Sequence, residues 1–85
     1  MTGAEEGPAI QGWVEMIARD LVDHTEAVAV SSFEDEGVQV FEVTVDPSEL
    51  GRVIGRQGRT VQALRTLLEA AGARHGRYYE LEIVE

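Results

Sequence analysis

Gly55 and Gly58 enclose Arg56 and Gln57 in the stretch Val-Ile-Gly-Arg-Gln-Gly-Arg-Thr-Val over residues 53–61. Glycine has no Cβ, so a phosphate-bearing ligand can lie close against such a turn. If a helix begins directly after the turn, its first N–H groups lack partners and its dipole adds partial positive charge. Arg56 and Arg59 add mobile positive charge. The spacing predicts a phosphate-binding turn.

The basic residues of the chain are concentrated around this turn. The formal net charge is −9, which by itself argues against a polyanionic ligand. Residues 51–79, however, hold six arginines and one acid, Glu69, which makes that segment +5. Residues 1–50 hold twelve acids and one arginine, a charge of −11. One basic element therefore lies on an acidic body, and net charge alone does not exclude nucleic acid.

Other kinds of chemistry lack the residues they need. The P-loop and the dinucleotide fingerprint both require a glycine where Val53 stands. His24 and His75 have no identifiable nucleophile or acid partner in the sequence, so we expect no enzyme, no catalytic residue and no cofactor. The absence of cysteine excludes disulfides and thiolate metal sites. The acidic stretch over residues 34–36 lacks calcium-ligand spacing, so we expect no metal.

Eighty-five residues with 44% hydrophobic residues indicate one small domain. Residues 1–9, acidic and glycine-rich, are expected to form a disordered N-terminal tail, and residues 10–85 the folded domain. No apolar run approaches the length of a membrane span, and the N-terminus lacks the pattern of a signal peptide. We therefore expect a cytoplasmic protein without membrane contact.

The first half of the domain predicts a helix and a hairpin. Apolar residues from Ile10 to Val22 follow helical spacing, and they include Trp13, which we assign to the core. Strands are predicted over 27–33 and 38–45, with a turn at 34–37, and should pair as an antiparallel hairpin. Phe41, Val43 and Val45 alternate with polar residues, so one face of the second strand should be buried.

The second half predicts two helices and a final strand. Asp46 can cap a short helix, Pro47 suits its first position, and Glu49 can reach back as in a capping box. Gly55 ends this helix. A second helix runs over 58–73, ending at Gly72 and Gly76, and a strand follows over 78–84. The order α-β-β-α-α-β makes the last two strands parallel neighbours. We expect an α+β fold with a three-stranded mixed sheet covered on one face by helices.

This order of elements and the turn together resemble a type II KH domain. Ile54, Gly55, Gly58 and Val61 occupy the places of the KH signature. The segments 21–23, 53–60, 70–72 and 81–85 resemble more closely the KhpA family of small bacterial one-domain KH proteins. The resemblance covers about residues 10–85.

The resemblance implies single-stranded RNA binding, with about four nucleotides gripped by the Gly-x-x-Gly loop. Such a protein would act as an RNA chaperone or a post-transcriptional regulator. Backbone N–H groups at residues 56–58 would face phosphate. Bases would lie over Val53, Ile54, Val61 and Leu64, or reach the edge of the final strand. The expected RNA-binding residues are Ile54, Gly55, Arg56, Gln57, Gly58, Arg59, Val61 and Gln62.

The KhpA family also implies a homodimer, or a heterodimer with a larger KhpB-like KH protein. Ala63, Leu67 and Ala70 extend the apolar stripe of the helix beyond one core face and could form the dimer surface. The alternative function is a protein–protein dimerisation or scaffold module with little RNA contact, which the acidity of residues 1–50 favours. A structural alternative remains for the apolar residues of the turn, which could belong to the core only: Val53, Ile54, Val61 and Leu64. Arg52 and Arg65 could instead pair with the nearby acids Glu49 and Glu69.

Overall fold

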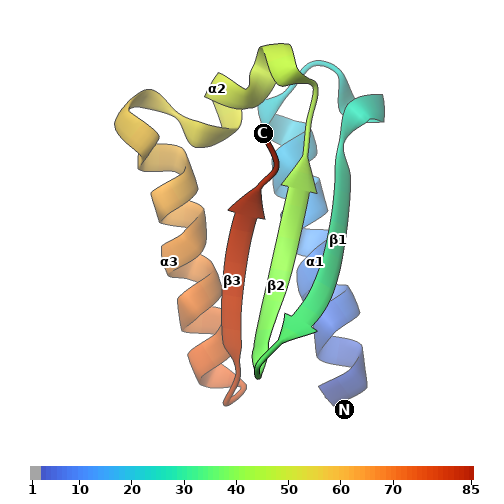
Figure 1. The fold of residues 1–85 in the computed structure, drawn as a ribbon, viewed down its shortest axis with the longest axis vertical. Coiled ribbons are helices and arrows are strands. Elements are labelled where there is room, and N and C mark those ends of the chain that lie inside the picture. Colours follow the sequence, from blue (N-terminus) through green and yellow to red (C-terminus); the bar gives the residue numbers. More distant parts are fainter. Residues whose placement is uncertain (1–2) are drawn as a thin grey trace.

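The structure is a computed structural model that describes the backbone of residues 3–85 and the side chains of residues 9–85. Its main elements confirm the predicted order of helices and strands (Figure 1). They are α1 (Gly3–Leu21), β1 (Ala29–Asp35), β2 (Val38–Thr44), α2 (Leu50–Ile54), α3 (Arg59–Arg74) and β3 (Tyr78–Ile83). Three short 3₁₀ segments lie between them: η1 (Thr25–Ala27), η2 (Pro47–Glu49) and η3 (Arg56–Gly58).

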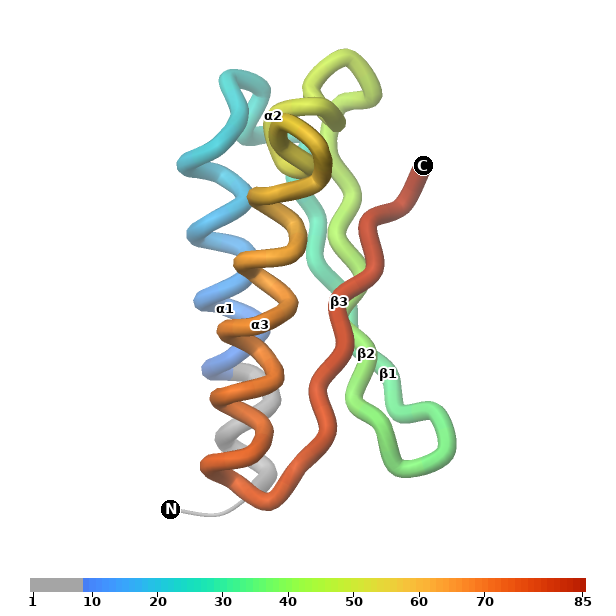
Figure 2. Tube along the Cα trace, turned by 90° about the vertical axis from the view of Figure 1, so that its left-hand side faces the viewer, coloured from blue at the N-terminus to red at the C-terminus, as the bar shows by residue number. Residues whose placement is uncertain are grey.

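The sheet has the strand order β1-β2-β3. β1 and β2 are antiparallel, with Ala29 opposite Thr44, and β2 and β3 are parallel, with Val38 opposite Tyr78. Figure 2 shows α1 and α3 side by side on one face of the sheet, while the other face carries no helix. The parallel pairing follows from the two-helix crossover between β2 and β3. The fold is therefore the α+β, type II KH arrangement expected from the sequence.

The boundaries of the first elements differ from the prediction. α1 begins at Gly3, before the amphipathic pattern that starts at Ile10. Residues 1–2 of the predicted tail lie outside the described residues, as do the side chains of residues 3–8, so the boundary at residue 10 stays a prediction. β1 starts two residues late because residues 25–27 form a 3₁₀ turn. The hairpin turn narrows to Glu36 and Gly37, whose φ of 52° and 84° suit a two-residue turn.

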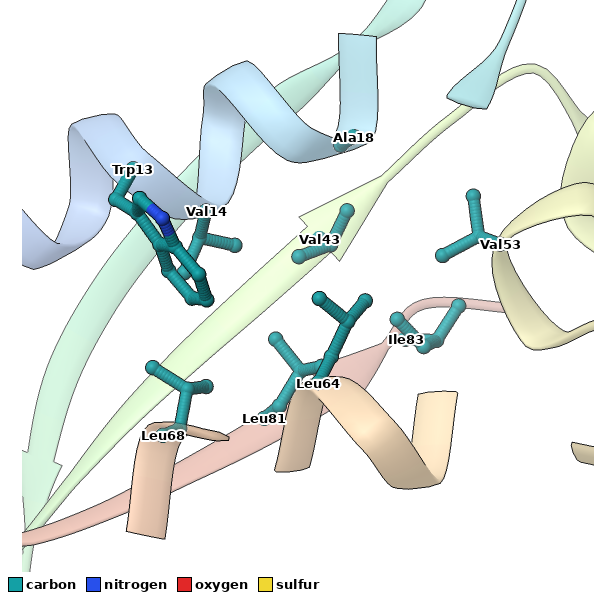
Figure 3. Close-up of a pocket in the computed structure, with 9 residues that line it drawn as sticks. All are labelled: Trp13, Val14, Ala18, Val43, Val53, Leu64, Leu68, Leu81 and Ile83. Atoms are coloured by element: carbon teal, nitrogen blue, oxygen red, sulfur yellow. The ribbon is translucent and has the colours of Figure 1, made fainter. Parts of the chain in front are cut away.

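The core lies between the sheet and the two long helices. Phe41 and Val43 of β2 and Val45 just after it are buried as the alternation predicted. Tyr79 of β3 meets Phe41 edge-to-face at a centroid distance of 5.5 Å. Trp13 packs against this core while half-buried. Figure 3 shows nine apolar residues around an interior gap of about 10 Å³. A gap this small and this apolar holds no ligand, so it belongs to the packing of the core.

Gly72 has a role that the sequence analysis missed. It does not end α3 but lies inside it, buried against the incoming β3. A Cβ at this position would lie 2.6 Å from the carbonyl oxygen of Arg77. The N–H of Arg77 in turn donates to the Gly72 carbonyl at 2.7 Å. The helix ends two residues later, and Gly76 follows with a φ of 68°. Gly72 is thus required for close helix–strand packing.

Candidate nucleic-acid interface

The segment that leads into the glycine turn is fixed by a cap at Asp46. The Asp46 carboxylate accepts hydrogen bonds from the Ser48 hydroxyl at 2.7 Å and from the Ser48 N–H at 2.9 Å. These two bonds lower the pKa of Asp46. Pro47 occupies the first position of η2, where its missing N–H costs nothing. The predicted cap is therefore confirmed.

The predicted capping-box role of Glu49 is wrong. Its side chain is buried and accepts the N–H of Asp23 at 2.7 Å and of His24 at 3.1 Å. These amides belong to the chain just after α1. Glu49 therefore ties the end of α1 to the start of α2, which leads into the glycine turn. A contact across 26 residues leaves no local sequence signal.

Two basic side chains complete the cluster around Glu49. The Nδ1 atom of His24 lies 3.1 Å from the carboxylate, and the Arg52 guanidinium lies 3.6 Å from it and 3.0 Å from Asp23. The predicted Arg52–Glu49 pair is thus present. The hydrogen bond to Glu49 raises the pKa of His24. Burial acts to raise the pKa of Glu49, but the hydrogen bonds from Asp23 and His24 prevail and lower it.

Gly55 is required by the packing of the turn itself. Its φ of 80° and ψ of 169° lie in a region that is open only to glycine. A Cβ there would collide with the Thr60 side chain and lie 2.8 Å from the Thr60 nitrogen. Gly55 therefore allows the first turn of α3 to fold back against the end of α2. The packing of the turn therefore requires a glycine here even without a ligand.

Gly58 is required for a different reason. Gln57 and Gly58 both take left-handed conformations, with φ of 57° and 75°. A Cβ on Gly58 would meet no atom within 4 Å, so this side of the turn is open. The Gly58 N–H donates to the Gly55 carbonyl at 3.0 Å, and the Arg59 N–H donates to the Arg56 carbonyl. The turn thus uses the Gly58 N–H for itself, which the sequence analysis did not foresee.

The polar side chains of the turn point into solvent. Arg56, Gln57, Arg59 and Gln62 are all exposed. The Arg59 guanidinium donates to the Gln57 side-chain oxygen at 3.1 Å, which holds the two side chains together. Within residues 9–85 the salt bridges involve Arg19, Arg52 and His24. In this part of the chain the charges of Arg56 and Arg59 are therefore not compensated by a carboxylate.

The apolar residues beside the turn divide into two groups. Val53 and Val61 are buried in the core, with exposed fractions of 1% and 6%. Ile54 and Leu64 pack against that core but remain half-buried. The surface available to a base in this conformation is thus Ile54 and Leu64. Val61 anchors the first turn of α3, although the sequence placed it in the binding surface.

The edge of β3 is partly occupied by an arginine. The Arg65 Nε donates to the Leu81 carbonyl at 3.3 Å, so the suggested Arg65–Glu69 pair is replaced by a contact to the strand. A groove of about 350 Å³ lies here between α3 and β3. Its lining comprises Arg65, Glu69, Tyr79, Glu80, Leu81 and Glu82. Because most of its charges are carboxylates, this groove is unsuited to phosphate.

The described residues hold no group of three or more acids, histidines or cysteines arranged for a metal ion. In the same residues, no helix combines the length and apolarity of a membrane span.

Comparison with known proteins relates the chain to one family. The family model described as "KhpA/KhpB, KH domain" matches residues 11–83. Curated relatives are called "RNA-binding protein KhpA". The one from Aquifex aeolicus (strain VF5) is 48% identical over 91% of this chain and 98% of its own length. The one from Halalkalibacterium halodurans is 43% identical over 85% of this chain and 95% of its own length.

A third relative of the same name, from Listeria monocytogenes serovar 1/2a, is 39% identical over 81% of this chain and 91% of its own length. Membership of a KH family agrees with the expectation that the chain is not an enzyme. The matched range includes the whole glycine turn and all three strands. With the mixed sheet, the two-helix crossover and the glycine turn between the helices, the chain belongs to the KhpA/KhpB family of KH domains.

Proposed function

We propose that the protein binds single-stranded RNA through the turn from Gly55 to Gly58. The observation that carries this proposal is the pair of uncompensated arginines, Arg56 and Arg59, on an exposed turn whose Gly58 side is open. A ligand with a negatively charged backbone is the natural complement of such a surface. The three relatives reported above carry the name "RNA-binding protein KhpA", which supports the same ligand.

The turn would contact the RNA backbone with both main chain and side chains. Because the Gly58 N–H is used inside the turn, the N–H groups of Arg56 and Gln57 are the donors that we assign to phosphate. Arg56 and Arg59 would add charge-assisted contacts. Bases would lie over Ile54 and Leu64, with Gln62 beside them. Such a surface fits about four nucleotides, as is usual for a KH domain.

We further propose that the protein acts in pairs in the cytoplasm, as a homodimer or with a KhpB-like protein. The supporting observation is an apolar groove between α1 and α3, lined by Ala9, Ile10, Trp13, Leu67 and Ala71. Leu67 in this groove is 53% exposed. Two linked RNA sites raise the affinity for one strand through effective concentration. An RNA chaperone or a post-transcriptional regulator would benefit from such pairing.

The experiment that tests the RNA site replaces Arg56 and Gln57 by aspartate together. Both side chains are exposed, so the fold should remain, while two carboxylates would repel phosphate. We expect the affinity for an unstructured RNA oligomer to fall about tenfold or more, or ~1.4 kcal/mol. Mobility shift measures the binding and circular dichroism the fold.

The matched control is Arg19→Asp with Ser31→Asp, which changes the net charge equally at exposed positions on α1 and β1. This control should bind RNA almost as well as the natural chain, apart from a small long-range charge effect. If the turn variant is folded and binds RNA unchanged, the proposed site is wrong. If both variants lose affinity equally, net charge is the cause and the turn has no special role.

A further inference from the structure

The face of the sheet opposite the helices carries side chains that RNA binding does not explain. The strand register brings outward-pointing residues of the three strands into rows across this face. One row joins Asp35, Val38 and Tyr78, and the next joins Phe33, Val40 and Glu80. Figure 2 shows this open face on the side away from α1 and α3.

Large apolar side chains are exposed on this face. Phe33 on β1 is 43% exposed, and Tyr78 on β3 is 76% exposed. Val40 lies between Phe33 and Glu80 on the open face and does not belong to the core cluster on the helical side. It is nevertheless only 3% exposed, so the side chains around it on the open face already cover it. Exposed aromatic residues grouped in this way are typical of protein contacts.

The charges that point outward from the three described strands are all negative. Arg77, directly before β3, is a cation beside this surface, and its guanidinium donates to the Gln39 side-chain oxygen at 3.2 Å. Asp35, Glu42, Glu80 and Glu82 point outward from the three strands, and no outward position of the described strands is basic. Glu36 in the hairpin turn adds a further carboxylate. A field of this sign repels the RNA backbone and attracts lysine and arginine. The open face is thus unsuited to RNA and suited to a cationic polypeptide.

A groove at the edge of the sheet extends this surface. It has a volume of about 300 Å³ and lies beside Tyr78, between β3 and the last turn of α3. Glu69, Ala73, Arg77, Tyr78 and Tyr79 line it. An aromatic or aliphatic side chain of a partner could insert here while its neighbours contact Phe33 and Val38.

We propose that the open face of the sheet docks a positively charged protein segment that carries an apolar or aromatic anchor. Phe33, Val38 and Tyr78 receive the anchor, and the surrounding carboxylates pair with lysine or arginine. An apolar centre with a charged rim is the common design of a specific protein contact. The proposal goes beyond RNA binding and does not depend on it, because the arginine-bearing turn is built between the helices.

A second copy of the chain does not fit this face in a two-fold pairing. In such a pair the same patch meets itself, so Asp35, Glu80 and Glu82 would face the partner's own carboxylates. Repulsion between these like charges disfavours that contact. The acidic face therefore needs a partner of the opposite charge.

The test uses the full chain labelled with ¹⁵N and a short synthetic peptide of lysines and leucines around one tryptophan. Titration should shift the amide signals of β1, β2 and β3 and leave those of residues 55–58 in place. A peptide with glutamate for lysine, and one with serine for tryptophan and leucine, should each bind at least about tenfold more weakly.

Two matched variants locate the contact. The double variant Phe33→Ser with Tyr78→Ser should bind the cationic peptide about tenfold or more weakly, because it lacks the anchoring surface. Met16→Ser removes a similarly exposed apolar side chain from the helical side, outside both proposed contact surfaces, and should leave binding unchanged. Circular dichroism confirms that both variants fold.

Several results would overturn the proposal. These are no binding of the cationic peptide, signal shifts confined to the glycine turn or the helical side, and equal losses in the two variants. Self-association of the natural chain that disappears in Phe33→Ser with Tyr78→Ser would identify a second copy as the occupant instead. An RNA oligomer that shifts the strand signals and leaves the turn unmoved would show that RNA occupies this face.

Discussion

At the scale of single residues, the two glycines of the turn between α2 and α3 have different roles. Gly55 takes a conformation that only glycine adopts, and it lies directly against Thr60. Gly58 also has a positive φ, but the space that a Cβ would fill is empty. The first glycine thus serves the fold, and the second leaves room for a ligand.

A pair of alanine substitutions separates these roles. Gly55→Ala should lower the free energy of unfolding by about 3 kcal/mol, through the forbidden conformation and the collision with Thr60. Gly58→Ala should lower it by only about 1 kcal/mol, the usual penalty of a left-handed alanine. Urea denaturation measures both values. Similar losses for the two variants would contradict the separate roles.

The same pair also tests the ligand. Gly58→Ala places a methyl group where the RNA backbone should approach, so its affinity for an RNA oligomer should fall severalfold although the domain stays folded. Binding of RNA to folded Gly58→Ala with unchanged affinity would show that the open side of the turn is not the contact surface.

At the scale of elements, the buried carboxylate of Glu49 joins two segments that are distant in sequence. It accepts two backbone N–H groups just after α1 and is followed directly by α2, which leads into the turn. His24 and Arg52 balance its charge. One ionisable side chain therefore helps to fix the position of the turn relative to α1.

This cluster predicts a pH dependence of stability. The raised pKa of His24 means that its contribution is complete below about pH 6.5 and is lost as the pH rises through the folded-state pKa. The lowered pKa of Glu49 means that its contribution is complete above about pH 4.5 and is lost as the pH falls through the folded-state pKa. Stability from this cluster should be greatest between these two values, as measured by thermal denaturation at a series of pH values.

Two variants identify the groups responsible. His24→Gln should remove the loss of stability above pH 6.5 but keep the loss under acidic conditions. Glu49→Gln should lower the melting temperature throughout and flatten both limbs, because a neutral amide replaces the carboxylate. Asp20→Asn, an exposed acid elsewhere on α1, should leave the profile unchanged. A profile that ignores both His24 and Glu49 would assign the pH dependence to other groups.

At the scale of the whole molecule, positive and negative charge are separated in space. The arginines of residues 51–79 surround the turn and α3, whereas the hairpin and the open face of the sheet are acidic. In the proposed complex, local positive charge would bind a polyanion against an unfavourable overall field. This balance should make RNA binding weak and sensitive to salt.

The salt dependence of RNA binding follows from the number of arginines that reach the strand. With about two to four phosphate contacts, a plot of log affinity against log salt should have a slope of about −1.5 to −3. Fluorescence anisotropy with a labelled RNA oligomer at several salt concentrations measures it. In Arg56→Ala the slope should become shallower, because about one phosphate contact no longer contributes to it. A slope of zero would exclude arginine–phosphate contacts as the source of affinity.

Self-association belongs to the same scale. If the groove between α1 and α3 is the dimer surface, Leu67→Glu should turn a dimer into a monomer, because it places a charge in an apolar contact. Sedimentation over a range of concentrations detects the change, with Tyr78→Glu on the opposite face as the control. A natural chain that is monomeric at high micromolar concentration would exclude self-pairing. A dimer that persists in Leu67→Glu would exclude this surface.

Local sequence pattern determined most of the helices and strands of this protein. The helical spacing from Ile10, the alternation of Phe41, Val43 and Val45, and the cap at Asp46 predicted elements that the structure confirms, because each depends on near neighbours. The glycine spacing with its flanking apolar residues indicated the KH fold and the exposed turn. Element boundaries were predicted less well. β1 begins at Ala29 and not at residue 27, because residues 25–27 form a 3₁₀ turn.

Tertiary structure decided what depends on contacts between distant segments. Glu49 reaches the chain after α1, Arg65 reaches the edge of β3, and Gly72 lies against the incoming strand. Val61 is buried where the sequence placed it in the binding surface, because helix spacing alone cannot say which neighbours cover a side chain. The acidic, aromatic open face likewise exists only once three strands align in register, since its residues come from separate parts of the chain.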